Sequence, residues 1–360
     1  MYPGIAVADA LKRVLPDCRP VFLCTQKEID RVILEAAGHE FIPQPIVPPV
    51  RTVGGLLKFW KSWRETRDLV RQVLHERKPR AVIGLGGYAA GMAVKSAALT
   101  KIPTAILNPD VVPGKANQYL MRHTRWVCCQ FEQSREHIAP SHRSKAVVTG
   151  CPIRSDIITL PPRAEAMARL GIDPRMMTLV VTGASLGAQT INEAVLELLK
   201  VVKLQGWQVL HLAGRDHALK VREGYRELEI DGRVIDFTPA MADVWSVADL
   251  CISRSGASSC AELTACGVAS VLLPYPYHKD MHQRVNAKVL ADAGAAVVID
   301  DEKDAKKNAA KLSPVVQSLL YDQTRRKTMA DAARRLGRPD AAEAVAKIVA
   351  EMAEERHEGT

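Results

Sequence analysis

The residues best suited to chemistry lie in the segment from Asp249 to Leu290. A short apolar run at 250–252 is followed by Ser-Arg-Ser-Gly at 253–256 and by small residues at 257–266. This order predicts a buried strand, a tight loop and a helix. Gly256 lets the backbone approach a ligand closely, and the first turn of the helix offers unpaired N–H groups at its positive dipole end. The segment therefore favours a bound diphosphate.

A carboxylate lies in the same expected helix. Glu262 comes one to two turns after Gly256, where it can accept hydrogen bonds from ribose hydroxyls, as acidic residues do at dinucleotide sites. A second apolar run at 269–273 ends at Pro274, and a polar loop and another helix follow. The repeated order of strand, loop and helix predicts a parallel sheet.

The same rhythm runs through the whole chain and defines its expected architecture. Glycine-rich loops at 86–91 and 183–188 also lie between an apolar run and a helical pattern, and a proline-rich stretch at 160–175 separates two such halves. We expect an α/β protein with two Rossmann-like domains facing each other across a cleft, at 1–157 and 158–339, and a C-terminal helix at about 340–355 packing back on the first. The expected strands are at 21–24, 81–85, 104–107, 126–130, 146–149, 179–181, 207–212, 234–237, 250–252 and 269–273.

Composition limits the classes of function. The chain has 360 residues, 47% of them apolar, which is enough for two domains of ordinary size. Its net charge of +9 suits anionic partners. Eight cysteines lack paired CxxC spacing, which favours buried free thiols in a reducing cytosol over a zinc site. No apolar run reaches the about 20 residues of a membrane span. No recognised nucleic-acid module accompanies the positive charge, so we expect no nucleic-acid partner.

The segment 51–80 is strongly basic and carries clustered apolar side chains. Aromatic residues interleaved with cations suit the interface of an anionic membrane. An ordinary amphipathic helix, with its aromatics in the core and its charges in water, explains the pattern as well. Both interpretations stay open. The apolar residues are Leu56, Leu57, Phe59, Trp60 and Trp63, and the cations among them are Lys58, Lys61 and Arg64.

The N-terminus departs from this architecture. A helical pattern at 5–15 precedes the first expected strand at 21–24, whereas a parallel α/β domain normally begins with a strand. Either the first domain lacks that strand, or the true start of the protein lies upstream of Met1.

Several motifs in a fixed order over nearly the whole chain resemble those of the MurG family of two-domain GT-B glycosyltransferases. The resemblance implies transfer of N-acetylglucosamine from UDP-N-acetylglucosamine (UDP-GlcNAc) to a lipid-linked muramyl-pentapeptide, lipid I, which yields the peptidoglycan precursor lipid II. It also implies a peripheral protein on the cytoplasmic face of the cell membrane, with an anionic membrane surface as partner. The matching residues are 3–8, Gly86-Gly87-Tyr88, 113–117, Gly150 with 152–154, Ser185 with 187–188, 254–257, Glu262, and 278–280 with Gln283 and Asn286.

The resemblance also assigns roles to individual residues. On the donor side, Ser185 would hold phosphate, the backbone at Thr238 would read uracil, and Glu262 would bind the ribose. Gln283 would read the sugar hydroxyls, and Arg154 would meet the nucleotide. The diphosphate would lie in the run Ala257, Ser258, Ser259, Cys260 and Ala261, and the acceptor would meet Gly86, Gly87, Tyr88 and Asn117. Residues Leu56, Leu57, Phe59, Trp60 and Trp63 would bring the first domain to the membrane.

Two departures from the family pattern bear on catalysis. The family's first glycine loop, GGTGGH, with its histidine suspected of general-base work, belongs immediately before Met1 and is missing. Asp110 stands where the family has an asparagine, and a carboxylate there could take a proton from an attacking hydroxyl. A neutral change in a loop explains Asp110 equally well. We expect an inverting displacement in which helix-end N–H groups stabilise the leaving diphosphate, with no metal or other cofactor.

Three other functions fit parts of the pattern. A related transferase acting on another lipid acceptor, such as diacylglycerol, would differ in the regions 56–63 and 86–91. UDP-sugar epimerases share the fold, although the membrane-type segment argues against them. A catalytically silent homologue that binds UDP-sugar or membrane would explain the missing first loop, but not the intact donor-side residues.

Overall fold

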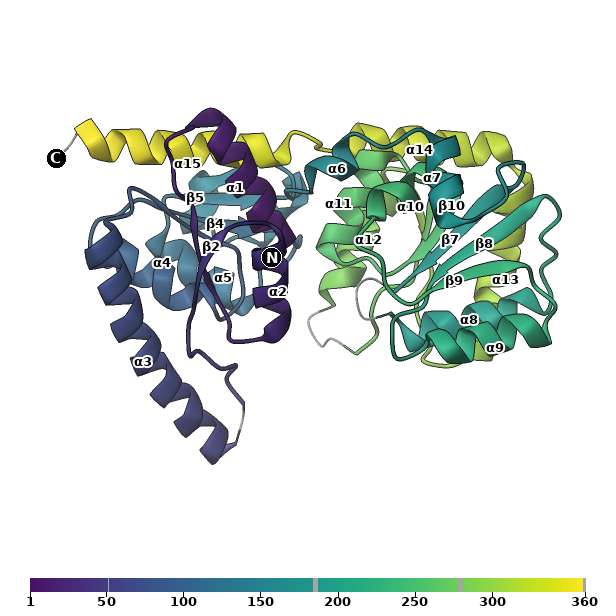
Figure 1. Ribbon diagram of the computed structural model, residues 1–360, viewed down its shortest axis with the longest axis horizontal. Coiled ribbons are helices and arrows are strands. Elements are labelled where there is room, and N and C mark those ends of the chain that lie inside the picture. The colour runs from purple at the N-terminus through teal and green to yellow at the C-terminus, as the bar shows by residue number, and fades with distance from the viewer. Residues whose placement is uncertain (51, 184–186, 278–280, 359–360) are drawn as a thin grey trace. The chain divides into compact units, whose positions relative to one another are not determined.

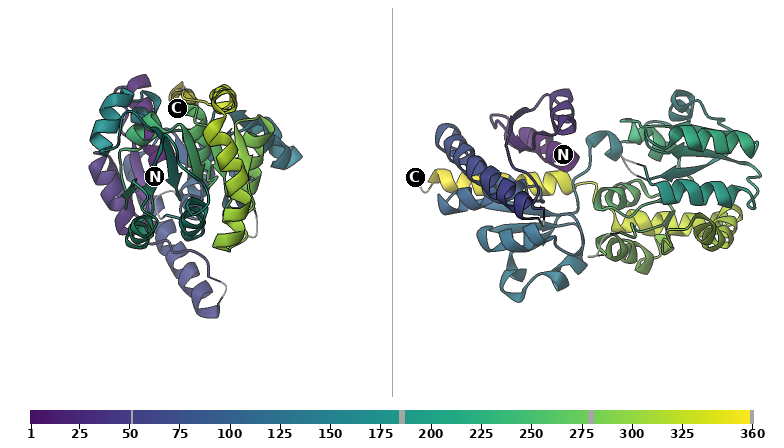
Figure 2. Two further views of the ribbon diagram at one scale, coloured as in Figure 1. Left: turned by 90° about the vertical axis from the view of Figure 1, so that its right-hand side faces the viewer. Right: turned by 90° about the horizontal axis from the view of Figure 1, so that it is seen from below.

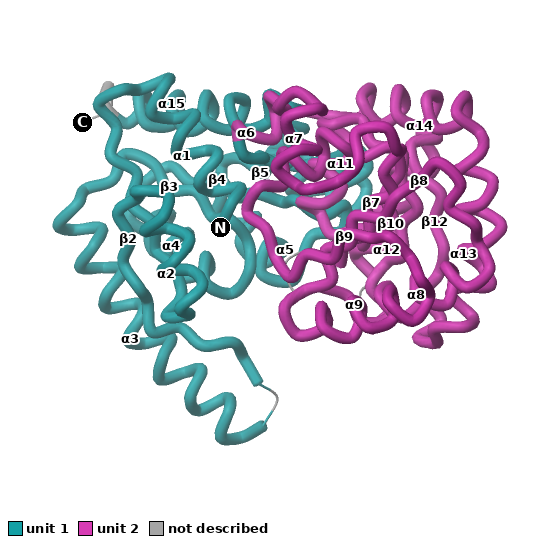
Figure 3. Tube along the Cα trace, turned by 45° about the vertical axis from the view of Figure 1, so that its right-hand side comes forward, with its two compact units in different colours: residues 1–154, 339–360 teal, residues 155–338 magenta. Residues whose placement is uncertain are grey.

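The computed structural model of the chain describes residues 1–50, 52–183, 187–277 and 281–358 (Figure 1). It divides into two compact units (Figure 3). Unit 1 comprises Met1–Arg154 and Pro339–Thr360, and unit 2 comprises Ser155–Arg338. Within the described residues, no helix is both long enough and apolar enough to cross a membrane.

Unit 1 contains two separate parallel sheets. The larger has the order β3-β4-β5-β6, formed by Val82–Gly84, Thr104–Asn108, Trp126–Cys129 and Ala146–Val148. The smaller pairs β1 (Val21–Cys24) with β2 (Glu40–Pro43). Every side chain of β4 is buried, as expected for a strand covered on both faces. In the described part of the chain, β1 pairs only with β2 and β3 only with β4.

The helices of unit 1 include both ends of the chain. They are α1 (Tyr2–Val14), α2 (Glu28–Ala36), α3 (Val53–Arg77), α4 (Ala90–Leu99), α5 (Lys115–Leu120) and α15 (Ala341–Glu358), with 3₁₀ turns at Met121–His123, Glu132–His137 and Pro140–Lys145. Helix α15 lies against α1 (Figure 1). Ala6 and Ala10 of α1 meet Ala342 and Ala346 of α15, and these small side chains let the two helices approach closely. Val345 also joins a cluster with Ala105 of β4.

Unit 2 is built on one six-stranded parallel sheet with the order β12-β11-β10-β7-β8-β9. The strands are β7 (Met177–Thr182), β8 (Trp207–Leu212), β9 (Gly232–Ile235), β10 (Leu250–Ser253), β11 (Ser270–Leu272) and β12 (Ala296–Val298). The helices are α6 (Ser155–Ile158), α7 (Arg163–Leu170), α8 (Gln189–Leu199), α9 (Ala218–Glu227), α10 (Met241–Val247), α11 (Ala257–Cys266), α12 (His282–Asp292), α13 (Ala305–Tyr321) and α14 (Gln323–Leu336).

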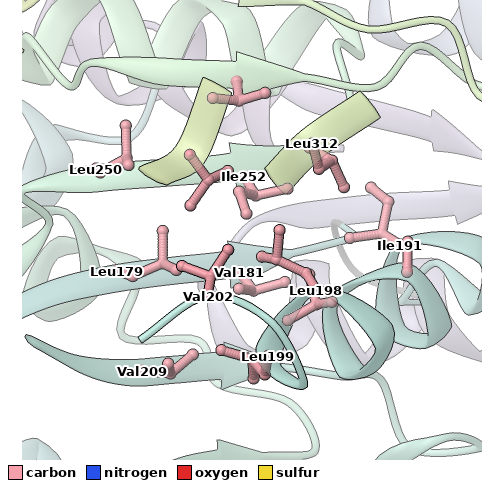
Figure 4. Close-up of a cluster of buried hydrophobic side chains, with 14 of the residues drawn as sticks. Leu179, Val181, Ile191, Leu198, Leu199, Val202, Val209, Leu250, Ile252 and Leu312 are labelled. Atoms are coloured by element: carbon pink, nitrogen blue, oxygen red, sulfur yellow. The ribbon is translucent and has the colours of Figure 1, made fainter. Parts of the chain in front are cut away.

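The core of unit 2 fixes the position of the strand ends. Leu179 and Val181 of β7 alternate onto the face that packs against Leu198 of α8 and Leu312 of α13 (Figure 4). A one-residue shift in strand register would turn these side chains to the other face, so burial specifies the register strongly. The candidate ligand-binding residues follow the carboxyl ends of β10 and β11. The core therefore holds the strand ends from which these residues extend.

Candidate functional site

The loop after β10 opens onto a helix N-terminus. Gly256 is the N-cap of α11, and no side chain in the described part of the chain caps this helix. The nearest described atom to the place where Gly256 would carry a Cβ is Gln283 Nε2, at 3.8 Å. The first-turn N–H groups of α11 lie at the positive end of the helix dipole, where an anion is stabilised.

Gln283, in the first turn of α12, is held so that it offers a hydrogen-bond donor. The backbone N–H of Tyr275 donates to Gln283 Oε1 at 3.0 Å, which leaves the amide nitrogen on the side of Gly256. Ser255 Oγ donates to Gln283 O at 2.8 Å, and Asn286 Nδ2 donates to Ser255 O at 3.2 Å. These bonds tie the start of α12 to the loop before α11.

Only part of the expected diphosphate run can meet a ligand through its side chains. Cys260 is fully buried and Ala261 nearly so, and Cys260 N donates to Gly256 O within the helix. Ser258 is exposed, while Glu262 is half-buried. Glu262 Oε2 accepts a hydrogen bond of 2.8 Å from Trp245 Nε1. The part of the run open to a ligand is thus the first turn and Glu262.

A buried ion pair supports the loop from behind. One guanidinium nitrogen of Arg254 donates to Asp301 Oδ2 at 2.8 Å and to Leu273 O at 2.9 Å, and the other donates to Thr190 Oγ1 at 2.6 Å. Burial by itself would raise the pKa of Asp301, but hydrogen bonds from Thr190, Asn308 and Arg254 hold it below its ordinary value. Arg254 thereby joins the ends of β10 and β11 to α8.

The remaining residues predicted to bind the donor lie outside the segment from β10 to α12. Thr238 is half-buried after β9, and its Oγ1 accepts a hydrogen bond from Ala240 N at 3.1 Å. Arg154 is the last residue of unit 1, with its guanidinium carbon 5.0 Å from the centre of the Tyr2 ring. Ser185 and the segment 278–280 lie outside the described residues.

The predicted acceptor residues meet at the carboxyl ends of β3 and β4 in unit 1. Gly86 and Gly87 adopt φ values of 92° and 74°, in the left-handed region that favours glycine. Asn117, on α5, is buried and donates from Nδ2 to Leu107 O at 2.8 Å and to Asn108 Oδ1 at 3.1 Å. Its Oδ1 lies 3.7 Å from the place of a Cβ at Gly86. The nitrogen of Asn117 is thus used within the protein, and it ties α5 to the carboxyl end of β4.

Asp110 lies in that same loop. It is half-buried, and its backbone oxygen accepts a hydrogen bond of 2.8 Å from Asn108 Nδ2. Tyr88 is also half-buried, and its carbonyl accepts a bond from Gly91 N at 3.3 Å. The structure therefore brings Gly86, Asn117 and Asp110 to one end of the four-stranded sheet.

The predicted membrane residues all lie in the first half of α3. Figures 1 and 2 show these turns standing away from the four-stranded sheet of their unit. Leu56, Leu57 and Trp60 are exposed, Leu57 by 66% and Trp60 by 60%, and they share one helix face with exposed Val53. Phe59 and Trp63 are half-buried and pack on each other with ring centres 5.5 Å apart. The exposed stripe does not fit the interpretation in which all the aromatics are core residues.

Sequence reasoning missed Trp245, Arg254 and Asp301 as supporting residues. Arg254 and Asp301 are separated by 47 residues and Trp245 and Glu262 by 17, so only the folded sheet and its helices bring them together. For Arg254 the sequence indicated a place in the loop at 253–256 and in the family-matching run 254–257, but no supporting role.

Comparisons with known proteins agree over nearly the whole chain. The glycosyltransferase family 28 N-terminal domain matches residues 1–128, and the glycosyltransferase family 28 C-terminal domain matches residues 178–345. The structure is similar to the crystal structure of Acinetobacter baumannii MurG, with a TM-score of 0.76 and 25% identity over 97% of this chain and 95% of that chain. This likeness confirms the GT-B fold class.

Two curated relatives carry the same name, UDP-N-acetylglucosamine–N-acetylmuramyl-(pentapeptide) pyrophosphoryl-undecaprenol N-acetylglucosamine transferase. The protein of Halothermothrix orenii is 32% identical over 98% of this chain and 96% of its own length. The protein of Thermoanaerobacter sp. strain X514 is 34% identical over 97% of this chain and 95% of its own length.

Proposed function

This chain belongs to the MurG family of N-acetylglucosamine transferases, and from that premise we propose how its residues carry out the reaction. The enzyme transfers N-acetylglucosamine from UDP-GlcNAc to lipid I and forms lipid II. An acceptor hydroxyl attacks the anomeric carbon of the sugar while the bond to UDP breaks. Negative charge grows on the leaving diphosphate, so N–H groups aimed at it lower the barrier.

The donor binds unit 2 at the loop between β10 and α11. The observation that supports this proposal is that the N-terminus of α11, which no described side chain caps, lies close to the fixed amide of Gln283. The N–H groups of Ala257, Ser258 and Ser259 receive the diphosphate. Gln283 donates to an oxygen of the sugar, Glu262 accepts from the ribose, and the backbone at Thr238 reads uracil. Ser185 holds phosphate and Arg154 meets the nucleotide.

The acceptor binds unit 1 at the loops after β3 and β4. Positive φ values at Gly86 and Gly87 expose backbone N–H groups to the diphosphate of lipid I, and Tyr88 lines the same loop. Asn117 holds α5 against the carboxyl end of β4, and its Oδ1 lies close to Gly86. Asp110 serves as the general base, because a half-buried carboxylate beside that loop can take the proton of the attacking hydroxyl.

Unit 1 reaches its lipid substrate through α3. Val53, Leu56, Leu57 and Trp60 enter the interface of an anionic bilayer, where Lys58, Lys61 and Arg64 meet lipid phosphates. Phe59 and Trp63 support this stripe from the domain side. The enzyme therefore works as a peripheral protein on the cytoplasmic face of the cell membrane.

Transfer of labelled N-acetylglucosamine from UDP-GlcNAc to a short-chain lipid I analogue tests the proposal. Gln283→Glu places a carboxylate beside the diphosphate, and we expect a fall of at least about a hundredfold in kcat/KM. Gln323→Glu, an exposed change at the start of α14, should leave the rate unchanged. Normal kinetics for Gln283→Glu would exclude this donor site.

The same assay tests the proposed base. Asp110→Asn should lower kcat by about a hundredfold or more while the KM for UDP-GlcNAc stays within about twofold, because general-base catalysis contributes typically 10²–10⁴-fold. A rate close to that of the unchanged enzyme would show that Asp110 is not the base.

A further inference from the structure

A buried indole holds the carboxylate of Glu262 in place. Trp245, on α10, is only 3% exposed, and its Nε1 donates to Glu262 Oε2 at 2.8 Å. Helix α10 packs against α7 and also contacts α11, which carries Glu262. The ring of Trp245 is thus fixed by packing, and the direction of its N–H is fixed with it.

This bond constrains Glu262 without using up its acceptors. An indole has a single N–H donor, whereas a carboxylate offers about four lone-pair positions. A glutamate side chain with no fixed partner samples several rotamers, and ordering it on binding costs free energy. A hydrogen bond from a rigid donor orders the carboxylate beforehand, and by itself it takes only one of these lone-pair positions.

We propose that Trp245 is a positioning residue that aims the Glu262 carboxylate at the ribose hydroxyls of the nucleotide. The inference rests on the proposed role of Glu262 in donor binding and adds the group that makes the role effective. It predicts that Trp245 contributes to the preference for ribose over deoxyribose, although the indole itself touches no substrate.

The competing explanation is that Glu262 merely satisfies a buried N–H group. In that case the loss of the indole N–H would lower stability and leave nucleotide selectivity untouched. The chain supplies a matched control in Trp207 of the same unit. Trp207 is 5% exposed, and its Nε1 donates to Leu320 O at 3.2 Å, a backbone acceptor on α13. Trp207→Phe therefore removes a similar buried hydrogen bond without changing Glu262.

The experiment measures, by calorimetry, the dissociation constants of the 360-residue chain for UDP and for 2′-deoxy-UDP. The ratio of the constant for 2′-deoxy-UDP to the constant for UDP reports recognition of the ribose 2′-hydroxyl. This measurement requires neither an acceptor nor turnover. We expect Trp245→Phe to lower this ratio at least about threefold, Glu262→Gln to lower it at least as much, and Trp207→Phe to leave it unchanged. In the Glu262→Gln background, Trp245→Phe should have no further effect on the ratio, because the two residues act as one unit.

The outcomes distinguish the positioning role of Trp245 from the ribose-binding role of Glu262. If Glu262→Gln lowers the ratio and Trp245→Phe does not, the positioning role of Trp245 is wrong and the ribose role of Glu262 stands. If neither change alters the ratio, the proposed ribose role of Glu262 is wrong as well, and the inference falls with it. If Trp207→Phe lowered the ratio as much as Trp245→Phe, the fall would be explained by general destabilisation of the unit. That outcome would also overturn the inference.

A second variant covers the case in which Trp245→Phe does not fold. Replacing residue 245 with benzothienylalanine exchanges the indole N–H for sulfur at nearly constant shape. Packing is then kept and only the donor is lost. The same fall in the ratio is expected, and an unchanged ratio in the folded protein would overturn the inference.

Discussion

His211 illustrates how burial sets the behaviour of a single residue. It is fully buried on β8, with Nδ1 2.9 Å from Tyr225 Oη and Nε2 3.0 Å from Asn192 Oδ1. Asn192 Nδ2 donates to Ala213 O, so Asn192 Oδ1 is an acceptor. The neutral ring therefore carries its proton on Nε2 and accepts at Nδ1 from the tyrosine hydroxyl. Both polar atoms of the ring are satisfied without charge.

A pH dependence of stability follows from this arrangement. Burial lowers the pKa of His211 to about 3, whereas an unfolded histidine titrates near 6.5. Below pH 6.5 the unfolded chain binds a proton that the folded chain does not, so stability is lost as the pH falls. We expect this residue to lower the free energy of unfolding by about 2 kcal/mol between pH 6.5 and pH 5, at about 1.4 kcal/mol per pH unit.

Urea unfolding at pH values from 7.5 to 5 measures the effect. His211→Gln removes the titrating group and should flatten this part of the slope, whereas His75→Gln, at an exposed position on α3, should leave it as in the unchanged protein. If the free energy of unfolding of His211→Gln fell with decreasing pH as steeply as that of the unchanged protein, groups other than His211 would cause the acid sensitivity.

Prediction from sequence at the residue scale depended on local spacing. Gly256 and Glu262 were identified because both follow one strand within a few residues, and the structure places Gly256 at the N-cap of α11 and Glu262 within that helix, as expected. Trp245 and Asp301 reach the same site from other elements, and nothing in their own neighbourhood distinguishes them from ordinary buried residues. The roles of the site residues remain predictions until binding is measured.

At the scale of elements, the proposed binding of the diphosphate by the N-terminus of α11 can be tested with a substitution that removes one backbone N–H donor. Proline is well tolerated at the first position of a helix, where its missing N–H breaks no helical bond. Gly256 has φ −61° and ψ 151°, which suits a residue before proline. We expect Ala257→Pro to weaken UDP binding about tenfold with little loss of stability, measured by calorimetry and thermal unfolding.

The control is the same change at another helix of unit 2. Ala305 is the first residue of α13, and its N-cap Asp304 has φ −134° and ψ 123°, also compatible with a following proline. Ala305→Pro should leave UDP affinity unchanged. Equal affinities for the two variants would mean that the N–H of Ala257 does not contact the diphosphate.

The exposed stripe of α3 predicts membrane binding that a single negative charge should weaken strongly. Leu57→Glu puts an anion into the stripe, which costs apolar contact and repels anionic lipid, so the partition coefficient should fall about tenfold or more. Sedimentation with vesicles containing phosphatidylglycerol measures this. Leu219, on α9 of unit 2, is exposed by the same 66%, and Leu219→Glu should have no effect. Equal losses in both variants would argue against a specific role of α3.

Elements were predictable where apolar runs and glycine loops marked them. The expected strands at 21–24 and 207–212 and the helix at 257–266 agree with β1, β8 and α11. The strand expected at 234–237 is β9 at Gly232–Ile235, shifted by two residues. Strand β2 was missed because only four residues, with partly exposed side chains, form it beside β1. A short edge strand of this kind has too weak a period-2 pattern to be identified.

At the scale of the whole molecule, the last helix of the chain belongs to the first unit. Residues 339–360 return to unit 1 after unit 2 is complete, and Val345 of α15 is fully buried in the cluster with Val7 and Ala105. The stability of unit 1 therefore depends on the two ends of the sequence together. A change in α15 should damage unit 1 and spare unit 2, which carries most of the proposed donor site.

Val345→Asp buries an unpaired carboxylate against β4 and should destabilise unit 1 by about 3 kcal/mol or more. Lys347→Asp, two residues away on the exposed side of α15, is its control and should behave as the unchanged protein. Because all the proposed donor residues except Arg154 belong to unit 2, UDP affinity should survive in Val345→Asp, while transfer to the lipid I analogue is lost. Calorimetric unfolding should show one transition moved to lower temperature and one unchanged. Loss of UDP binding together with transfer would contradict a donor site built mainly from unit 2, since α15 contributes no residue to that unit.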